Sequence, residues 1–197
     1  MALTQHQIDS AQIVYNILFD MGYNHTSAIG IIGNVHIESA GTWSPTIEEY
    51  GGGGGFGLAQ WTPKETLYTQ ASMLGLSRNE AETIEGQAKV IGSGDITGQW
   101  MVDVSHLDYG VGTPVVNPMT LTEFKQLDDL GQAVANFMAH WERPSELVHH
   151  YDWRYEAAIE FDQVIKGKKV DKKETKEKED DTIILYLTNV LNWGSYY

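Results

Sequence analysis

Cysteine is absent from this chain of 197 residues, and basic residues are scarce in most of it. The lack of cysteine excludes a disulfide framework, thiolate zinc sites and any cysteine nucleophile. Residues 1–165 contain six Lys and Arg against 21 Asp and Glu, a net charge of −15. A surface this acidic repels the nucleic-acid backbone, so we expect no nucleic-acid partner.

Long apolar runs and a leader sequence are also missing. No stretch approaches the ~20 apolar residues that span a bilayer, so we expect no membrane span. The N-terminus, MALTQHQIDSAQ, has no basic region followed by an apolar one, and it predicts no Sec signal. The HExxH and H-x-H metal motifs are absent as well. His140, His149 and His150 are a weak ligand cluster, and we expect neither a metal nor a cofactor.

The first 165 residues are dominated by helical signals. Thr4 with Gln7, and Ser77 with Glu80, have the spacing of capping boxes. Apolar residues at helical spacing predict further helices from near Thr26, from 62–65, from Asp128 or Asp129, and from Ser145 to Ile165. Residues 92–119 show no clear period and are interpreted mainly as loop, and the glycine-rich stretch within 43–61 predicts a short β-hairpin. The predicted fold class is therefore α+β and mostly helical.

Composition divides the chain into three parts. Residues 1–165 predict one globular domain, and residues 166–181, with 13 charged residues in 16, predict a solvated linker or an isolated charged helix. Residues 182–197 are apolar again but too short to cross a membrane. This last segment is a docking element on the domain or on a partner, or the start of a further domain, and the sequence does not choose between these.

Glu38 stands at the end of an apolar predicted helix, before the break at Gly41 and Pro45. Desolvation by apolar neighbours and the negative end of the helix dipole both disfavour its ionised form, so the sequence predicts a raised pKa. A carboxylic acid that stays protonated near neutral pH can protonate a glycosidic oxygen. Taken alone, a Glu near a helix end is more often a solvated surface residue.

Five glycines at 51–55 are followed by aromatic and amide side chains at Phe56, Gln60 and Trp61. Sugar rings stack on aromatic faces, and sugar hydroxyl and N-acetyl groups need hydrogen-bond partners. These three residues are therefore the predicted substrate-binding residues of a polysaccharide cleft. By itself, a glycine run is more often a flexible loop, and a Trp is more often part of the core.

Three motifs in order carry a more specific resemblance. They are Gly33-Asn34…Glu38-Ser39, then Gly55-Phe56-Gly57-Leu58-Ala59-Gln60-Trp61-Thr62-Pro63, and then Trp141-Glu142-Arg143-Pro144. In order and residue pattern they resemble the motifs of the phage tail lysozymes, which are cell-wall-degrading units in tail-tip proteins of short-tailed phages that infect Gram-positive bacteria. The resemblance covers about residues 10–165.

That resemblance implies a lysozyme-like fold, a peptidoglycan substrate and cleavage between N-acetylmuramic acid and N-acetylglucosamine, with Glu38 in the position of the catalytic glutamate. Glycosidases normally use two carboxylates. Glu49 is the predicted second carboxylate, although it and Glu48 can equally be solvated loop acids. Glu142 and Arg143 are assigned to fold maintenance, and His36 to the core or to the rim of the cleft.

The implied location is the phage tail tip, acting on the host wall, with other tail proteins as partners through the C-terminal segment. An endolysin that waits in the host cytoplasm until lysis is the alternative. A non-catalytic wall-binding tail component, a lytic transglycosylase, and a peptidase or amidase are the competing functions, although the lack of cysteine excludes the cysteine/histidine amidase-peptidases.

Overall fold

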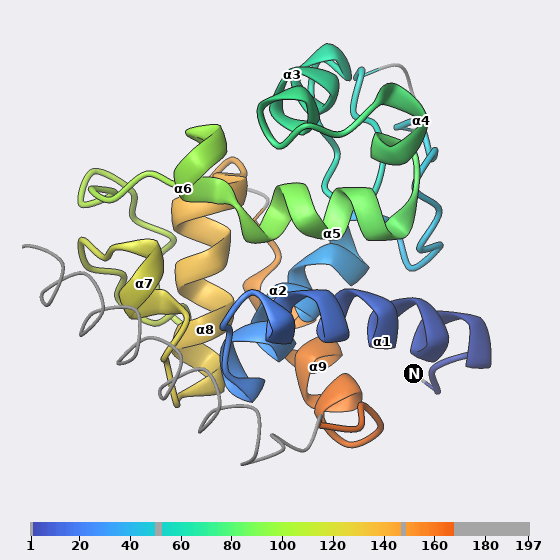
Figure 1. Cartoon of the computed structure of the whole chain (residues 1–197). Coiled ribbons are helices and arrows are strands. Elements are labelled where there is room, and N and C mark those ends of the chain that lie inside the picture. The colour runs from blue at the N-terminus through green and yellow to red at the C-terminus, as the bar shows by residue number, and fades with distance from the viewer. Residues whose placement is uncertain (1, 50–52, 147–148, 168–197) are drawn as a thin grey trace, which may run out of the picture. The chain divides into compact units, whose positions relative to one another are not determined.

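In a computed structural model of the chain, residues 2–49, 53–146 and 149–167 are described, and Met1–Lys166 form one compact unit. This part of the chain is mostly helical, as the sequence predicts (Figure 1). None of its helices is long and apolar enough to cross a membrane. The charged linker and the apolar C-terminal segment predicted for 166–181 and 182–197 lie, apart from residues 166 and 167, outside the described residues.

The helices are α1 Gln5–Asp20, α2 His25–Glu38, α3 Glu65–Met73, α4 Arg78–Ala81, α5 Ile84–Gly92, α6 Gly94–Thr97, α7 Leu121–Phe124, α8 Leu130–Phe137, the π-helical turn η1 Met138–Glu142, and α9 Tyr151–Asp162.

Two predicted capping boxes are confirmed. Thr4 caps α1 and Ser77 caps α4, and in each case the residue three positions on, Gln7 or Glu80, bonds back to the cap. Each box satisfies two backbone N–H groups that the helix leaves without an internal partner. A third box, formed by Thr120 and Glu123 at α7, was not predicted.

Two predicted helix starts are wrong. The helix expected from Thr62 begins at Glu65, because Thr62 donates its hydroxyl hydrogen bond to the Gln60 carbonyl and does not cap the helix. The last helix begins at Tyr151 and not at Ser145, directly after His150, whose left-handed backbone (φ 51°) cannot continue an α-helix from the N-terminal side. Within residues 92–119, read as loop, α6 forms one short helix.

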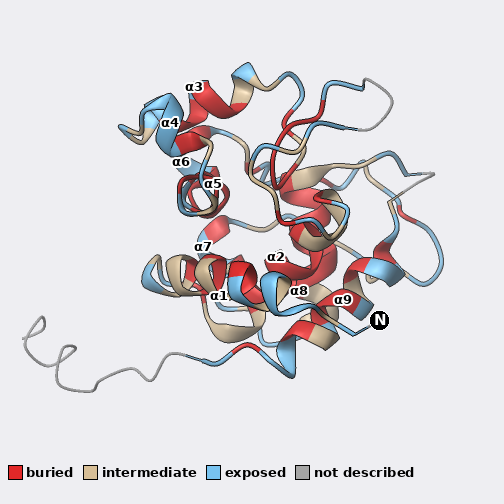
Figure 2. Cartoon of the chain, turned by 90° about the vertical axis from the view of Figure 1, so that its right-hand side faces the viewer, coloured by how far each residue is buried: buried red, intermediate tan, exposed pale blue. Residues whose placement is uncertain are grey.

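The centre of the unit is α2, which is buried along most of its length and packs against α9 and α8 (Figures 1 and 2). Two glycines make this close packing possible. A Cβ at Gly30 would lie 2.7 Å from the Ala133 Cβ on α8, and one at Gly33 would lie 2.5 Å from the Arg154 carbonyl oxygen on α9. Contacts this short are forbidden, so only glycine lets both helices approach α2.

The β-hairpin predicted between residues 43 and 61 is not observed as a pair of strands. In the described part of this segment, pairing is limited to one isolated antiparallel bridge between Glu48 and Phe56. Glycines lack the side chains whose cross-strand contacts stabilise a sheet, and they weaken a strand entropically. The left-handed backbone at Gly54 and Gly57 further departs from strand geometry.

Candidate active site

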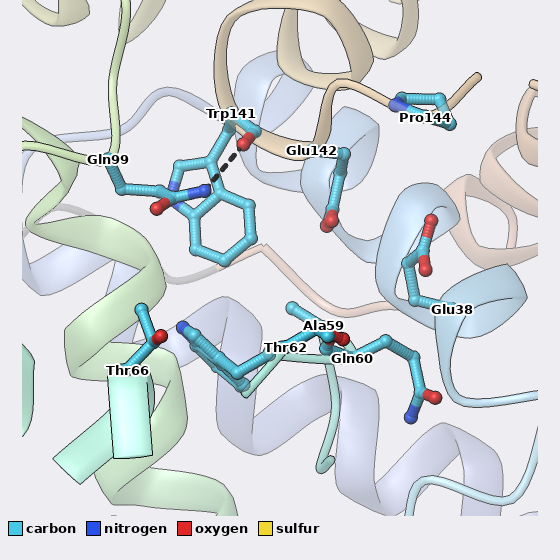
Figure 3. Close-up of a pocket in the computed structure, with 10 residues that line it drawn as sticks. Glu38, Ala59, Gln60, Thr62, Thr66, Gln99, Trp141, Glu142 and Pro144 are labelled. Atoms are coloured by element: carbon cyan, nitrogen blue, oxygen red, sulfur yellow. Dashed lines mark hydrogen bonds between the residues drawn. The ribbon is translucent and has the colours of Figure 1, made fainter. Parts of the chain in front are cut away.

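A pocket with a volume of about 300 Å³ lies at the end of α2 (Figure 3). It brings together residues from the three motifs, which are far apart in the sequence. Gln99, from the segment read as loop, also contributes. The residues that line the pocket are Glu38, Ala59, Gln60, Trp61, Thr62, Thr66, Gln99, Trp141, Glu142 and Pro144.

Glu38 is the last residue of α2, so the predicted helix end is confirmed. Its Oε1 accepts a hydrogen bond of 2.5 Å from the Nη2 of Arg154 on α9, and the two side chains form an ion pair. The Glu38 side chain keeps 18% of its exposure, whereas that of Arg154 keeps 3%. The Glu38 side chain can therefore meet a ligand, while its cationic partner is shielded from solvent.

Arg154 is fixed by three acceptors. Besides Glu38, it donates from Nη1 to Asn34 Oδ1 at 3.0 Å and from Nε to the His149 carbonyl oxygen at 2.8 Å. The Asn34 amide nitrogen is itself bonded to the Gly30 and Val134 carbonyl oxygens, so its oxygen points to Arg154. A buried guanidinium with its donors directed in this way holds a carboxylate in one orientation.

The first motif thus acquires a physical explanation. Gly33 lets the backbone of α9 approach, Asn34 orients Arg154, and Arg154 holds Glu38. Sequence reasoning missed Arg154, which lies 116 positions after Glu38 in the chain. The one signal that pointed to it was the scarcity of basic residues in the acidic domain.

Two of the three predicted substrate-binding residues, Gln60 and Trp61, line the Glu38 pocket. The indole N–H of Trp61 donates to Gln70 Oε1 at 2.8 Å, and its ring meets that of Trp141 edge to face at 5.7 Å. Trp61 is 4% exposed, so it forms part of a wall and does not project as an open platform. The Gln60 amide nitrogen donates to the Gly57 carbonyl oxygen at 2.9 Å.

Phe56 and Glu49 do not line the Glu38 pocket. They line a separate pocket of about 250 Å³, together with Glu48, Gly54, Gly55 and Lys64. The Glu49 Oε2 accepts a hydrogen bond from the Gly55 backbone N–H at 3.1 Å. The structure therefore does not bring the predicted second carboxylate into the pocket of Glu38.

The pocket holds another carboxyl in its place, that of Glu142. Burial raises the pKa of the Glu142 carboxyl well above its ordinary value. The negative charge of Glu38 acts in the same direction, while Arg154 and Arg143 oppose it. The sequence analysis assigned Glu142 to fold maintenance, although Glu142 lies within the third motif, Trp141-Glu142-Arg143-Pro144.

The histidines have structural contacts. His36 Nδ1 accepts a hydrogen bond from the Trp43 indole at 3.0 Å, and its ring packs against Phe161. Burial lowers the pKa of His36, which favours the neutral ring. In the portion of the chain that the structure describes, no group of three or more His, Asp or Glu side chains is placed to hold a metal ion.

Comparison with known proteins identifies the family of the chain. A family model described as phage tail lysozyme matches residues 9–164. The chain belongs to the phage tail lysozyme family. Membership confirms the resemblance drawn from the three motifs and assigns the chain to the lysozyme-like proteins of phage tails.

One relative is Morphogenesis protein 1 of Bacillus phage B103. It is 28% identical to this chain over 141 residues, which are 69% of this chain and 34% of that protein. The matching segment therefore spans about a third of the relative's length.

Proposed function

We propose that this phage tail lysozyme is a glycoside hydrolase of Gram-positive peptidoglycan. The bond that it cleaves lies between N-acetylmuramic acid and N-acetylglucosamine, and Glu38 acts as the general acid. The protein acts from the phage tail tip on the host wall during entry. A lysozyme-like fold and a tail-protein partner for the C-terminal segment belong to the same proposal.

The observation that carries the proposal is the shared pocket of Glu38, Gln60 and Trp61. A carboxyl group, a primary amide and an indole wall are the groups that protonate a glycosidic oxygen, bind an N-acetyl group and cover a sugar face. The pocket volume of about 300 Å³ lies at the lower end of the range for small-ligand sites. An open cleft of this size suits a sugar unit of a longer strand.

The chemistry needs a proton donor at the leaving oxygen and a second group that deals with the attacking water. Glu38 reaches the pocket from a rigid helix end and is held by Arg154, which gives the reacting group a fixed direction. Glu49, the second carboxylate predicted from sequence, accepts a hydrogen bond from its own loop, and its catalytic role stays a prediction.

The test is the Glu38→Gln variant of the full chain on purified Gram-positive cell walls. General acid–base groups contribute about 10²–10⁴-fold to rate, so release of reducing ends should fall by that factor. Glu65→Gln, at an exposed carboxylate outside the pocket, is the matched control and should keep wild-type activity. Circular dichroism checks that both variants are folded.

The fragments identify the reaction. Reducing muramic ends support hydrolysis, whereas anhydro-muramic ends identify a transglycosylase and new amino termini identify a peptidase or amidase. Binding of walls without any cleavage identifies a non-catalytic tail component. Undiminished lysis by Glu38→Gln contradicts the assignment of Glu38.

A further inference from the structure

Glu142 occupies an unusual position in the backbone. Helix α8 continues into the π-helical turn Met138–Glu142. The turn ends before Arg143, whose backbone lies in the left-handed region (φ 53°), and Pro144 follows. The Arg143 guanidinium closes this turn by donating from Nη1 to the carbonyl oxygens of His140 at 2.6 Å and Gln99 at 2.8 Å. Wide π turns are rare and occur frequently at functional sites, because they change the direction of a side chain.

The Glu142 carboxyl is poorly matched to a purely structural role. Its Oε1 is buried and has no hydrogen-bond partner among the described residues. A buried polar atom without a partner costs stability, and a buried charge without a partner costs more. A residue kept only to maintain the fold would be expected to use both oxygens in hydrogen bonds.

Glu142 and Glu38 share the pocket but have opposite surroundings. Both residues line the pocket, and in the view of Figure 3 the Glu142 carboxyl lies between Trp141 and Glu38. Arg154 donates a hydrogen bond to Glu38, whereas the buried oxygen of Glu142 has no donor. Two carboxylates in one low-dielectric site repel each other, so one of them retains a proton.

We propose that Glu142 is the second reacting carboxyl of this site and that it forms with Glu38 a pair holding one proton. The inference rests on the proposed glycosidase function and supplies the partner that this chemistry requires. It assigns to Glu142 the place that the sequence gave to Glu49.

The pair balances the reaction. A proton leaves one carboxyl for the glycosidic oxygen as the bond from that oxygen to the anomeric carbon breaks. A water oxygen then bonds to the anomeric carbon, and a proton of that water passes to the other carboxyl. The pair therefore holds one proton before and after each turnover, and in coupled groups the proton belongs to the pair.

The charged groups around Glu142 are consistent with a single proton. Burial and Glu38 raise the pKa of Glu142, while Arg154 and Arg143 lower it, and the net direction is upward. Arg154 donates its Nη2 hydrogen bond to Glu38. The raised pKa of Glu142 is thus consistent with a pair that holds one proton, which belongs to both carboxyl groups and passes to the glycosidic oxygen from Glu38.

The experiment compares wild type, Glu142→Gln and Glu65→Gln, each as the full chain, in reducing-end release from cell walls across pH. We expect Glu142→Gln to lose about 10²–10⁴-fold in rate, the usual contribution of an acid–base group. We also expect its alkaline limb to move to lower pH by about one unit or more, because the carboxyl with the raised pKa is then missing from the site. Glu65→Gln, at the exposed carboxylate outside the pocket, should retain the wild-type rate and profile.

A lower rate with an unmoved alkaline limb, or an undiminished rate, overturns the proposal. So does a Glu65→Gln variant that shows the same loss. The shift in the profile is the decisive readout, because a merely structural role for Glu142 would lower the rate without moving the limb.

Infrared spectroscopy of wild type labelled with ¹³C at the Glu carboxyls gives a readout that needs neither activity nor a folded variant. We expect a protonated carboxylic acid band at pH 7, and its absence overturns the proposal. If wild type releases no reducing ends but shows this band, the proposed function fails while the proton-holding pair stands.

Discussion

Two regions of the molecule hold their glutamate carboxyl groups in different ways. Glu38 and Glu142 are the last residues of α2 and η1, and Glu38 is held by Arg154 from α9. Glu49 lies in the loop before the glycine run and accepts a hydrogen bond from the Gly55 backbone of that same loop. The first arrangement fixes a carboxyl relative to the rest of the fold, and the second fixes it only relative to its own loop.

This difference matters for chemistry because catalytic groups must be held close to their working geometry. At Glu38, close packing at Gly33 and the hydrogen bonds of Arg154 provide such a fixed geometry. The comparison teaches that proximity in sequence to Glu38 is a poor guide to which carboxyl group shares its pocket. A residue 104 positions later shares the pocket, and one 11 positions later does not.

The largest effect should come from Arg154→Ala. Removing the guanidinium leaves the Glu38 carboxylate and the buried Asn34 oxygen without their donor. Breaking a buried pair by removing one partner costs about 3–5 kcal/mol, and urea unfolding measures it. Arg78→Ala, at an exposed Arg over the Tyr68 ring, is the control and should cost about 1 kcal/mol or less. Equal losses of unfolding free energy in the two variants would show that the region around Glu38 does not depend on Arg154.

Gly33→Ala tests the close approach of α9. The added Cβ would lie 2.5 Å from the Arg154 carbonyl oxygen, so α9 must shift, and overpacking of this kind costs about 1–3 kcal/mol. The control is Gly131→Ala on α8, where the nearest atom is the end of the Tyr151 side chain at 3.1 Å. Thermal unfolding of the two variants should separate them, and a neutral Gly33→Ala would contradict the packing argument.

Glu142→Gln should change how stability depends on pH. The pKa of Glu142 is raised in the folded protein, so its contribution to stability is full below the ordinary value of 4.5 and is lost as pH rises toward the folded value. Within that window, wild type should lose about 1.4 kcal/mol per pH unit relative to Glu142→Gln. Urea unfolding at several pH values measures the difference, and parallel curves would mean that Glu142 ionises in the fold as it does when unfolded.

The smallest effect is expected for Glu49→Gln. The Gln oxygen can still accept the Gly55 backbone hydrogen bond, so the free energy of unfolding should change by no more than about 0.5 kcal/mol. Urea unfolding at neutral pH checks this. A large loss of unfolding free energy would show that the loop of Glu49 is bound to the fold through the Glu49 carboxylate. The two regions would then hold their carboxyl groups in similar ways.

Local signals predicted much of the fold. The capping boxes at Thr4 and Ser77, and the end of α2 at Glu38, follow from side chains within a few positions of one another. The start of α3 was wrong because the Thr62 hydroxyl bonds to the nearby Gln60 carbonyl, which competes with capping. The π turn at Glu142 left no signal in the apolar period of α8.

The sequence by itself determined the helical character, the position of Glu38 at a helix end and the family, because each depends on short-range patterns or on motifs in order. The tertiary structure alone decided which groups face Glu38. Arg154 reaches Glu38 because Gly33 lets two helices pack closely, and Glu142 lies in the same pocket at the end of the π turn that follows α8. Contacts between residues more than a hundred positions apart depend on packing geometry, which no local pattern encodes.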